Sequence, residues 1–226
     1  MMVEDWELSP RAAVARQREL ALQVVQRDEL GEPRWVAGVD VGFPQRGRIT
    51  QAAAVLMCVD TLATVAWATV QLPTRFPYVP GLLSFREVPA MLQALAQLPR
   101  RPDLLLCDGH GLAHPRRFGS ACHLGVITAI PCIGVGKSRL VGTYELPGLT
   151  RGERSALHHR GEVIGTVLRT RSAVKPVIVS VGHRVSLAGA VDWVLRLAPK
   201  FRLPEPIRSA DRLASNRVSV SAAEDA

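Results

Sequence analysis

The chain has 226 residues, enough for one domain, and 47% of them are hydrophobic, which suffices for a sizeable buried core. No apolar run approaches the roughly 18 residues needed to cross a bilayer, and the charged N-terminus lacks an apolar signal segment, so neither a membrane span nor a leader is expected. The net charge of +8 favours a polyanionic partner, but only slightly over a basic protein without one.

The four cysteines show neither C-x-x-C pairing nor the spacing of a zinc site. They are Cys58, Cys107, Cys122 and Cys132, and three of them lie in apolar runs typical of a core. A reduced, cytoplasmic compartment is therefore expected.

The first predicted element is a helix that Ser9 caps and whose apolar stripe extends to Val25. The stretch Trp35–Gly42 then alternates as a strand does. This alternation places Asp40 on the face opposite the apolar side chains.

Two apolar runs, 52–59 and 62–70, follow with only two residues between them, and they predict an antiparallel hairpin. A loop over 73–84 leads to a helix whose apolar side runs from residue 88 to 98. The short, wholly apolar stretch 104–107 is typical of a central strand that is buried on both faces.

The rest of the chain alternates helices and strands. The predicted elements are a helix at 118–128, strands at 132–135, 163–168 and 177–181, a helix at 187–197 with Ser186 as its cap, and a short helix after Pro206. Consecutive antiparallel strands followed by α/β crossovers predict a mixed β-sheet flanked by helices, the layout of the ribonuclease H-like α/β fold. One domain is expected over 1–212, followed by a small, polar tail over 213–226 that is predicted to be disordered.

Asp40 and Asp108 are the first candidate functional residues, because a carboxylate among apolar strand residues is costly to bury unless it is paired or binds a metal. Carboxylates are ligands that Mg²⁺ and Mn²⁺ prefer, and two such ions can stabilise the attacking and leaving oxygens of a phosphodiester. The alternatives are a core hydrogen bond for Asp40 and a turn-forming Asp-Gly pair for Asp108. The residues alone leave both open.

Glu87 is a candidate third carboxylate. The spacing Ser84-x-x-Glu87 also fits a capping box, in which the glutamate only closes the N-terminus of its helix. Taken alone, the local pattern favours the cap, although the two roles are compatible.

The segment from Asp108 to Gly119 (DGHGLAHPRRFG) contains three glycines, Gly109, Gly111 and Gly119. Glycines permit close approach of the backbone to a ligand. Its donors for anionic oxygens are His110, His114, Arg116 and Arg117. The position directly after a buried aspartate favours a site over a solvated turn.

Lys137 and His183 each follow a predicted strand. Lys137 would project at the C-terminal end of the sheet, where sites in α/β proteins collect. Its spacing from the preceding glycines does not fit a phosphate-binding P-loop. His183 would repeat this geometry after the predicted strand 177–181 and before a helix. The alternatives are an ordinary surface residue for Lys137 and a structural role for His183.

Five stretches of the chain, taken together, resemble the endonuclease V family. They are VAGVDVGF around Asp40, PYVPGLLSFREVP around Tyr78 and Glu87, DGHGLAHPRRFGSACHLG after Asp108, IGVGKSRL around Lys137, and VGHRVS around His183. The terminal RLPEPIRSAD also fits. The match runs in order from about residue 10 to residue 212, which is nearly the whole chain.

The resemblance implies a DNA repair endonuclease that uses Mg²⁺, or Mn²⁺ in its place. Such an enzyme finds deoxyinosine and hydrolyses the second phosphodiester bond 3′ to the lesion. By the same resemblance Asp40 and Asp108 would bind the metal, Glu87 and His183 would be further members of the site, and Lys137 would position or stabilise the reacting phosphate.

The resemblance also assigns DNA contacts. Tyr78 would be the wedge that fills the space left by an extruded base, and its neighbours in the DNA-binding set are Pro77, Val79, Arg86, His114 and Arg116. The base pocket would be lined by Gly81, Leu83, Gly109, Gly111, Gly119 and Leu140. Two positions depart from the family's pattern: Ser120 stands where a more apolar residue is expected, and Gly136 where alanine is equally familiar.

Other interpretations need fewer of these residues. Another ribonuclease H-like nuclease, acting on junctions or RNA–DNA hybrids, needs the carboxylates but no wedge at Tyr78. A catalytically silent nucleic-acid-binding module does not need Asp40, Asp108 and Lys137 together. The expected partner is DNA that contains deoxyinosine or another deaminated base, with inosine-containing RNA as an alternative, and the expected state is a monomer.

Overall fold

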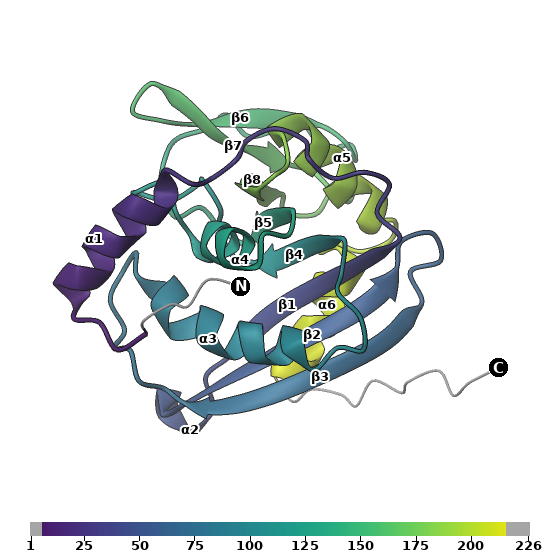
Figure 1. The fold of residues 1–226 in the computed structure, drawn as a ribbon. Helices are drawn as coiled ribbons and strands as arrows, with labels where there is room; N and C mark the ends of the chain where they lie inside the picture. The colour runs from purple at the N-terminus through teal and green to yellow at the C-terminus, as the bar shows by residue number, and fades with distance from the viewer. Residues whose placement is uncertain (1–5, 216–226) are drawn as a thin grey trace.

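The computed structural model describes residues 6–215, which form an eight-stranded sheet flanked by helices (Figure 1). Along the sheet the strands follow the order β3-β2-β1-β4-β5-β8-β7-β6. The strands are β1 (Trp35–Gly42), β2 (Ile49–Cys58), β3 (Thr64–Pro73), β4 (Leu104–Asp108), β5 (Cys132–Gly136), β6 (Arg154–His159), β7 (Glu162–Leu168) and β8 (Val177–His183). The helices are α1 (Pro10–Ala21), α2 (Pro44–Gly47), α3 (Leu83–Ala96), α4 (Ser120–Thr128), α5 (Leu187–Leu197) and α6 (Glu205–Ala214).

The centre of the sheet is parallel and its two sides are antiparallel. β1 pairs in parallel with β4, and β4 in parallel with β5. The hairpin of β2 and β3 extends one side, and β8, β7 and β6 extend the other with antiparallel pairings. The mixed sheet that the sequence predicts is thereby confirmed. β4 is buried along its length until its last residue, Asp108, as expected for a central strand.

Helices cover both faces of the sheet. α3 and α4 pack against the face that carries Ala37 and Val39, whereas α5 and α6 pack against the face that carries Val36 and Leu106. The alternation in β1 therefore separates two hydrophobic cores, and Asp40 lies on the face opposite Ala37 and Val39, as predicted. Ser9 caps α1 by accepting a hydrogen bond from an α1 backbone N–H, and Ser186 caps α5 in the same way.

α6 lies unusually close to β1, behind the central strands in Figure 1. A side-chain carbon added to Gly38 would lie 2.1 Å from the backbone carbon of Pro206, and one added to Gly42 would lie 2.4 Å from the backbone oxygen of Ala214. Only glycine permits this approach, because any Cβ would clash with backbone. Asp40 lies between these two glycines and therefore faces α6.

Several elements differ from the prediction, and one of them is the short helix α2, which was not predicted. The first helix ends at Ala21, so Val25 lies in the following loop. β6 was not predicted, because its sequence RSALHH is mostly polar and it forms the exposed edge of the sheet. α6 continues to Ala214, and Leu213 is buried, so the ordered domain passes the predicted boundary at residue 212. The rest of the predicted tail, from residue 216, lies outside the described residues.

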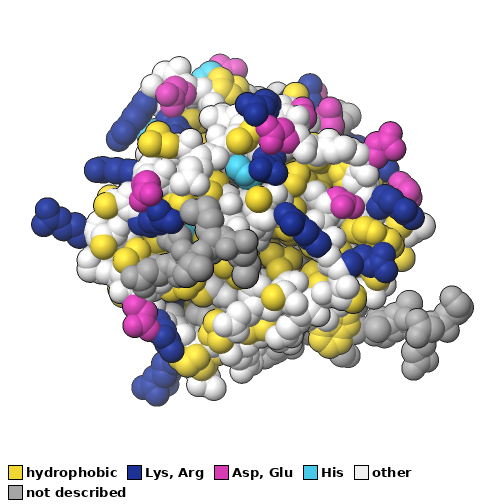
Figure 2. Space-filling view, viewed as in Figure 1, with side chains coloured by type: hydrophobic (Ala, Val, Ile, Leu, Met, Phe, Trp, Pro, Cys, Tyr) yellow, Lys and Arg dark blue, Asp and Glu magenta, His cyan; other side chains and the backbone are white. Residues whose placement is uncertain are grey.

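The surface matches the basic composition. Figure 2 shows Lys and Arg side chains distributed over the visible face, several of them projecting at the margin where α1 lies in Figure 1. Arg11 and Arg18 are exposed residues of α1. Within residues 6–215, no helix has both the length and the apolar character that a membrane span requires. All four cysteines are free thiols.

Candidate active site

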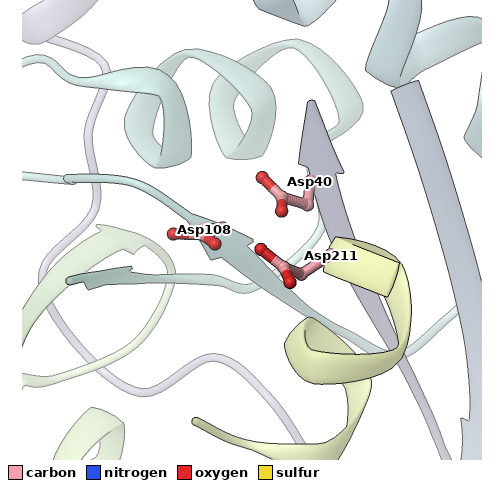
Figure 3. Close-up of side chains that lie close together, drawn as sticks. All are labelled: Asp40, Asp108 and Asp211. Carbon is pink, nitrogen blue, oxygen red and sulfur yellow. The ribbon is translucent and has the colours of Figure 1, made fainter. Parts of the chain in front are cut away.

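Three aspartates from three separate elements meet at the C-terminal end of the parallel strands. Asp40 comes from β1, Asp108 ends β4, and Asp211 lies on α6. One carboxylate oxygen of each lies within 4.8 Å of the others. Figure 3 shows the three side chains pointing toward a common centre. The cluster exists because neighbouring parallel strands end at the same edge and because α6 packs directly on β1.

Lys137, just after β5, lies among these carboxylates. Its Nζ is 2.6 Å from Oδ2 of Asp108, 2.7 Å from Oδ1 of Asp211 and 3.9 Å from Oδ2 of Asp40. The predicted placement of Lys137 beside Asp40 and Asp108 is therefore what the structure shows. Its side chain is 41% exposed, whereas that of Asp108 is only 8% exposed, so solvent reaches the site from the lysine side.

The electrostatics of the cluster oppose full ionisation. Burial, together with the neighbouring carboxylate of Asp108, raises the pKa of Asp40 from its ordinary value of 3.8 to about 8, although Lys137 acts against this. Burial likewise raises the pKa of Asp108. Burial alone would lower the pKa of Lys137, but the carboxylates around it outweigh that effect and raise it.

The donor set fits a hard divalent cation. Three carboxylates face one ammonium group, so the ionised cluster carries excess negative charge in a largely buried place. Mg²⁺ and Mn²⁺ prefer such oxygen ligands. The residues positioned to hold such an ion are Asp40, Asp108 and Asp211.

Asp211 was missed by the sequence analysis as a member of the site. It lies about 100 residues after Asp108, within an amphipathic helix, where an aspartate is ordinarily a solvated residue. Two features of the sequence could have indicated it. Asp211 ends the stretch RLPEPIRSAD, which resembles the endonuclease V family, and Gly38 and Gly42 of β1 allow a neighbouring element to approach Asp40.

Glu87 is not part of a capping box, contrary to the local pattern. α3 begins at Leu83, one residue before Ser84, and no side chain caps it. Ser84 instead forms a 3.0 Å hydrogen bond with the ring of His123, while Glu87 accepts a 2.7 Å hydrogen bond from the hydroxyl of Ser120. Burial raises the pKa of Glu87 to about 7, and the Ser120 hydroxyl opposes that rise.

A cavity of about 160 Å³ adjoins the carboxylate cluster. Glu87 and Asp108 lie in its wall, which connects it with the aspartates. The remaining lining residues are Gln17, Tyr78, Pro80, Gly81, Leu83, Ser84, Gly109, His110, His114, Phe118, Gly119, Ser120 and Leu140. Five of the six predicted pocket residues are in this wall.

The sixth, Gly111, supports the pocket from behind. A side-chain carbon added to it would lie 1.9 Å from the backbone oxygen of Val181, and its N–H donates to the hydroxyl of Ser180. Gly111 is therefore required for packing against β8 and does not line the cavity.

The predicted wedge stands at the rim of this cavity. Tyr78 is 69% exposed, so its ring does not pack on the flank of the domain. Pro77 is also exposed, and Val79 is half-buried. Prolines on both sides of the Tyr78–Val79 pair restrict the backbone and keep this short loop extended.

The three basic side chains predicted to contact DNA here, Arg86, Arg116 and His114, interact with other parts of the protein or are buried. Arg86 donates to the carbonyl of Gly47 and lies over the ring of Phe43. Arg116 donates to the carbonyl of Gly81. His114 is buried, and this burial lowers its pKa to about 4, so the ring is neutral at physiological pH.

His183 lies away from the carboxylates, so the predicted placement is wrong. β8 runs antiparallel to β5, and its last residue pairs with Cys132 at the start of β5. The carboxylate end of the sheet is at Val135, beside Val179, four residues from His183, or roughly 13 Å along a strand. The ring of His183 accepts a hydrogen bond from the backbone N–H of Val25, which is a structural role.

A mixed sheet of this order, with aspartates at the ends of adjacent parallel strands, defines the class of protein as one with the ribonuclease H-like fold. The sequence profile of endonuclease V matches residues 18–212, and the chain belongs to the endonuclease V family.

Relatives and solved structures agree with this assignment. Endonuclease V of Azotobacter vinelandii is 55% identical over 94% of this chain and 96% of its own length. The crystal structure of endonuclease V from Streptomyces avermitilis is 47% identical, covers 94% of both chains and superposes with a TM-score of 0.89. Endonuclease V of Ciona intestinalis is 27% identical over 92% of this chain and 96% of its own, with a TM-score of 0.80, and was crystallised with a 24mer DNA containing an inosine followed by a ribo-adenosine.

The raised pKa of Asp40 predicts an unusual dependence of stability on pH. The folded state holds this proton more tightly than the unfolded chain, so the free energy of unfolding falls as pH rises from about 4 to about 8. In EDTA at pH 8, Asp40→Asn should therefore melt higher than the wild type, because it removes the cost of a buried charge next to Asp108, by about 2–4 °C for each kcal/mol of that cost. Lys137 keeps its two shorter ion pairs in this variant.

Melting curves at pH 4, 6 and 8 provide the measurement. The advantage of Asp40→Asn should shrink as the pH is lowered, and added Mg²⁺ should raise the melting temperature of the wild type more than that of the variant. A variant that melts lower than the wild type at pH 8, or a difference that does not change with pH, would contradict the electrostatic account.

Proposed function

We propose that this endonuclease recognises deaminated bases in DNA, chiefly deoxyinosine, and hydrolyses the second phosphodiester bond 3′ to the lesion with Mg²⁺, for which Mn²⁺ can substitute. The observation that carries the proposal is the cavity beside the aspartate cluster, which shares Asp108 with the cluster, is also lined by Glu87, and has Tyr78 exposed at its rim. This arrangement supports the proposal, because an extruded base in the cavity would lie next to the carboxylates proposed for phosphodiester hydrolysis.

The aspartates supply the metal-binding part of the proposed mechanism. Asp40, Asp108 and Asp211 would hold the ion, as their mutual distances allow. Bound there, Mg²⁺ supplies Lewis acidity toward a phosphate oxygen and toward water. Burial, the largest cause of the raised pKa values of Asp40 and Asp108, disfavours their ionised forms, which a bound cation would stabilise.

Lys137 and Glu87 have complementary proposed roles. The ammonium group of Lys137 is held by Asp108 and Asp211 at the exposed side of the cluster, where it can contact a non-bridging phosphate oxygen. Glu87, with a pKa of about 7, can accept or release a proton near neutral pH. It lines the cavity together with Asp108, so base binding and proton transfer would be adjacent.

Tyr78 is the proposed wedge. An extruded base leaves a gap in the stack, and lifting it costs a few kcal/mol, less at a damaged or mismatched pair. The exposed ring of Tyr78 has a stiff, proline-bounded backbone and therefore loses little entropy when it fills this gap.

The DNA in the crystal structure of the Ciona relative contains an inosine, which supports the choice of substrate. That DNA also carries a ribo-adenosine after the inosine, which makes inosine-containing RNA the second candidate substrate. We further propose that the protein acts as a monomer in the cytoplasm, where its four free cysteines would stay reduced.

The direct test of the proposed function is nicking of end-labelled duplexes that differ only in one base, deoxyinosine or deoxyadenosine. With Mg²⁺, the inosine duplex should be cut at the second phosphodiester bond 3′ to the lesion, and EDTA should stop the reaction. An inosine-containing RNA strand of the same sequence tests the second candidate substrate, which is supported if the RNA is cut faster than the DNA.

Asp108→Asn serves as the matched variant in this assay. It should abolish nicking while it retains affinity for the lesion, since most DNA contacts come from other groups. Ca²⁺ should support binding without cleavage, because its looser coordination does not suit the in-line reaction. Mg²⁺-dependent cleavage by Asp108→Asn at the wild-type rate would refute the proposal. Equal cleavage of the deoxyinosine and deoxyadenosine duplexes by the wild type would also refute it.

A second prediction concerns Tyr78→Ala. Affinity for the inosine duplex should fall by about 1–3 kcal/mol, the usual contribution of base–aromatic stacking. Affinity for an undamaged duplex depends on phosphate contacts and should stay unchanged. Tyr78→Phe keeps the ring and should behave as the wild type. Equal losses on both duplexes in an equilibrium binding titration would show that Tyr78 is not the wedge.

A further inference from the structure

Gln17 is a fully buried polar side chain on α1, far in sequence from every residue of the proposed mechanism. It occupies the inward stripe of this helix together with Ala13 and Leu20, both of which are apolar. A buried amide is costly unless its donors and acceptor are satisfied, so its contacts indicate why it is there.

The amide of Gln17 joins two loops of the base cavity. Its Nε2 donates to the carbonyl of Phe118 at 2.7 Å and to the carbonyl of Gly81 at 3.0 Å. Its Oε1 accepts a hydrogen bond from Nε of Arg116. Both N–H groups and the oxygen are thus used, and Gln17 itself lies in the wall of the cavity.

Arg116 completes this arrangement from the opposite loop. Its Nη2 donates to the carbonyl of Gly81 at 2.6 Å, so that carbonyl receives hydrogen bonds from both side chains. Gly81 has a φ of +78°, and a side-chain carbon on it would lie 2.7 Å from Nη2 of Arg116. The end of the Tyr78 loop is therefore held in one conformation by groups from α1 and from the 116–119 loop.

We propose that Gln17 is a positioning residue for lesion recognition, which fixes the Tyr78 loop relative to the base pocket through Gly81, Phe118 and Arg116. This inference rests on the proposed function, because it specifies how the wedge and the pocket are kept in register. A displacement of about 1 Å in such an arrangement is enough to impair a site. Arg116 acts in it as an internal clamp, and the outer face of α1 remains available to the DNA backbone.

The test uses two variants of the full-length chain. Gln17→Glu has nearly the same shape and can still accept from Arg116, but it cannot donate to the carbonyls of Gly81 and Phe118. Gln17→Met has a similar volume and no charge, and it removes the three hydrogen bonds that the Gln17 amide forms with Gly81, Phe118 and Arg116. The control is Val194→Ala, a cavity-forming change in the buried face of α5, a helix that packs against β7 and β8.

Both Gln17 variants should bind the inosine duplex about tenfold more weakly, the effect of one or two lost buried hydrogen bonds. Binding to the undamaged duplex should be unchanged, and the single-turnover nicking rate at saturating protein should be largely retained. Val194→Ala should lower the melting temperature while leaving the ratio of the two affinities at the wild-type value.

Hydrogen–deuterium exchange of the free protein gives a readout that does not depend on activity. Peptides covering 77–82 and 116–119 should exchange faster in both Gln17 variants and not in Val194→Ala. Unchanged exchange together with an unchanged affinity ratio in either folded Gln17 variant would overturn the inference, as would an equal change in Val194→Ala. A wild type without any preference for inosine would instead refute the proposed function, whatever the exchange of the loops.

Discussion

The close packing of α6 on β1 is the constraint on which the site depends. Gly38 and Gly42 let the helix backbone reach the strand, and Asp40 lies between them on the same face. Asp211 is thereby brought to two aspartates that precede it by more than 100 residues. A larger residue at either glycine would move the helix outward and separate the third carboxylate from the others, whatever its effect on the two hydrophobic cores.

This packing concentrates negative charge where water is scarce. Lys137 compensates only part of it, and burial raises the pKa of Asp40 and of Asp108, so a divalent cation bound there would stabilise the folded chain. The same region is continuous with the base cavity through Glu87 and Asp108. In the proposed function, recognition and hydrolysis therefore share one wall of the cavity, and hydrogen bonds from Gln17 on α1 hold the loops that form the rest of it.

Features of the fold and site that depend on local sequence pattern could be predicted. Positions that depend on strand direction or on packing between distant segments could not. Alternation in β1 placed Asp40 correctly, and the apolar run before Asp108 predicted a central strand. Asp211 was missed, because helix periodicity does not reveal which strand the helix will cover. His183 was placed wrongly, because nothing local distinguishes the antiparallel β8 from a parallel strand. The capping pattern at Glu87 was overridden by a helix that starts one residue earlier and by a hydroxyl on α4.

The measurement that tests the central claim most directly is a Mn²⁺ titration of the wild type, Asp211→Asn and Asp192→Asn, followed by electron paramagnetic resonance. Asp192 is an exposed aspartate of α5, outside the cluster, and serves as the charge-matched control. If α6 completes a metal site, Asp211→Asn should bind Mn²⁺ at least about tenfold more weakly, while Asp192→Asn binds it as the wild type does. Equal Mn²⁺ affinity in the wild type and Asp211→Asn would contradict this account of the site.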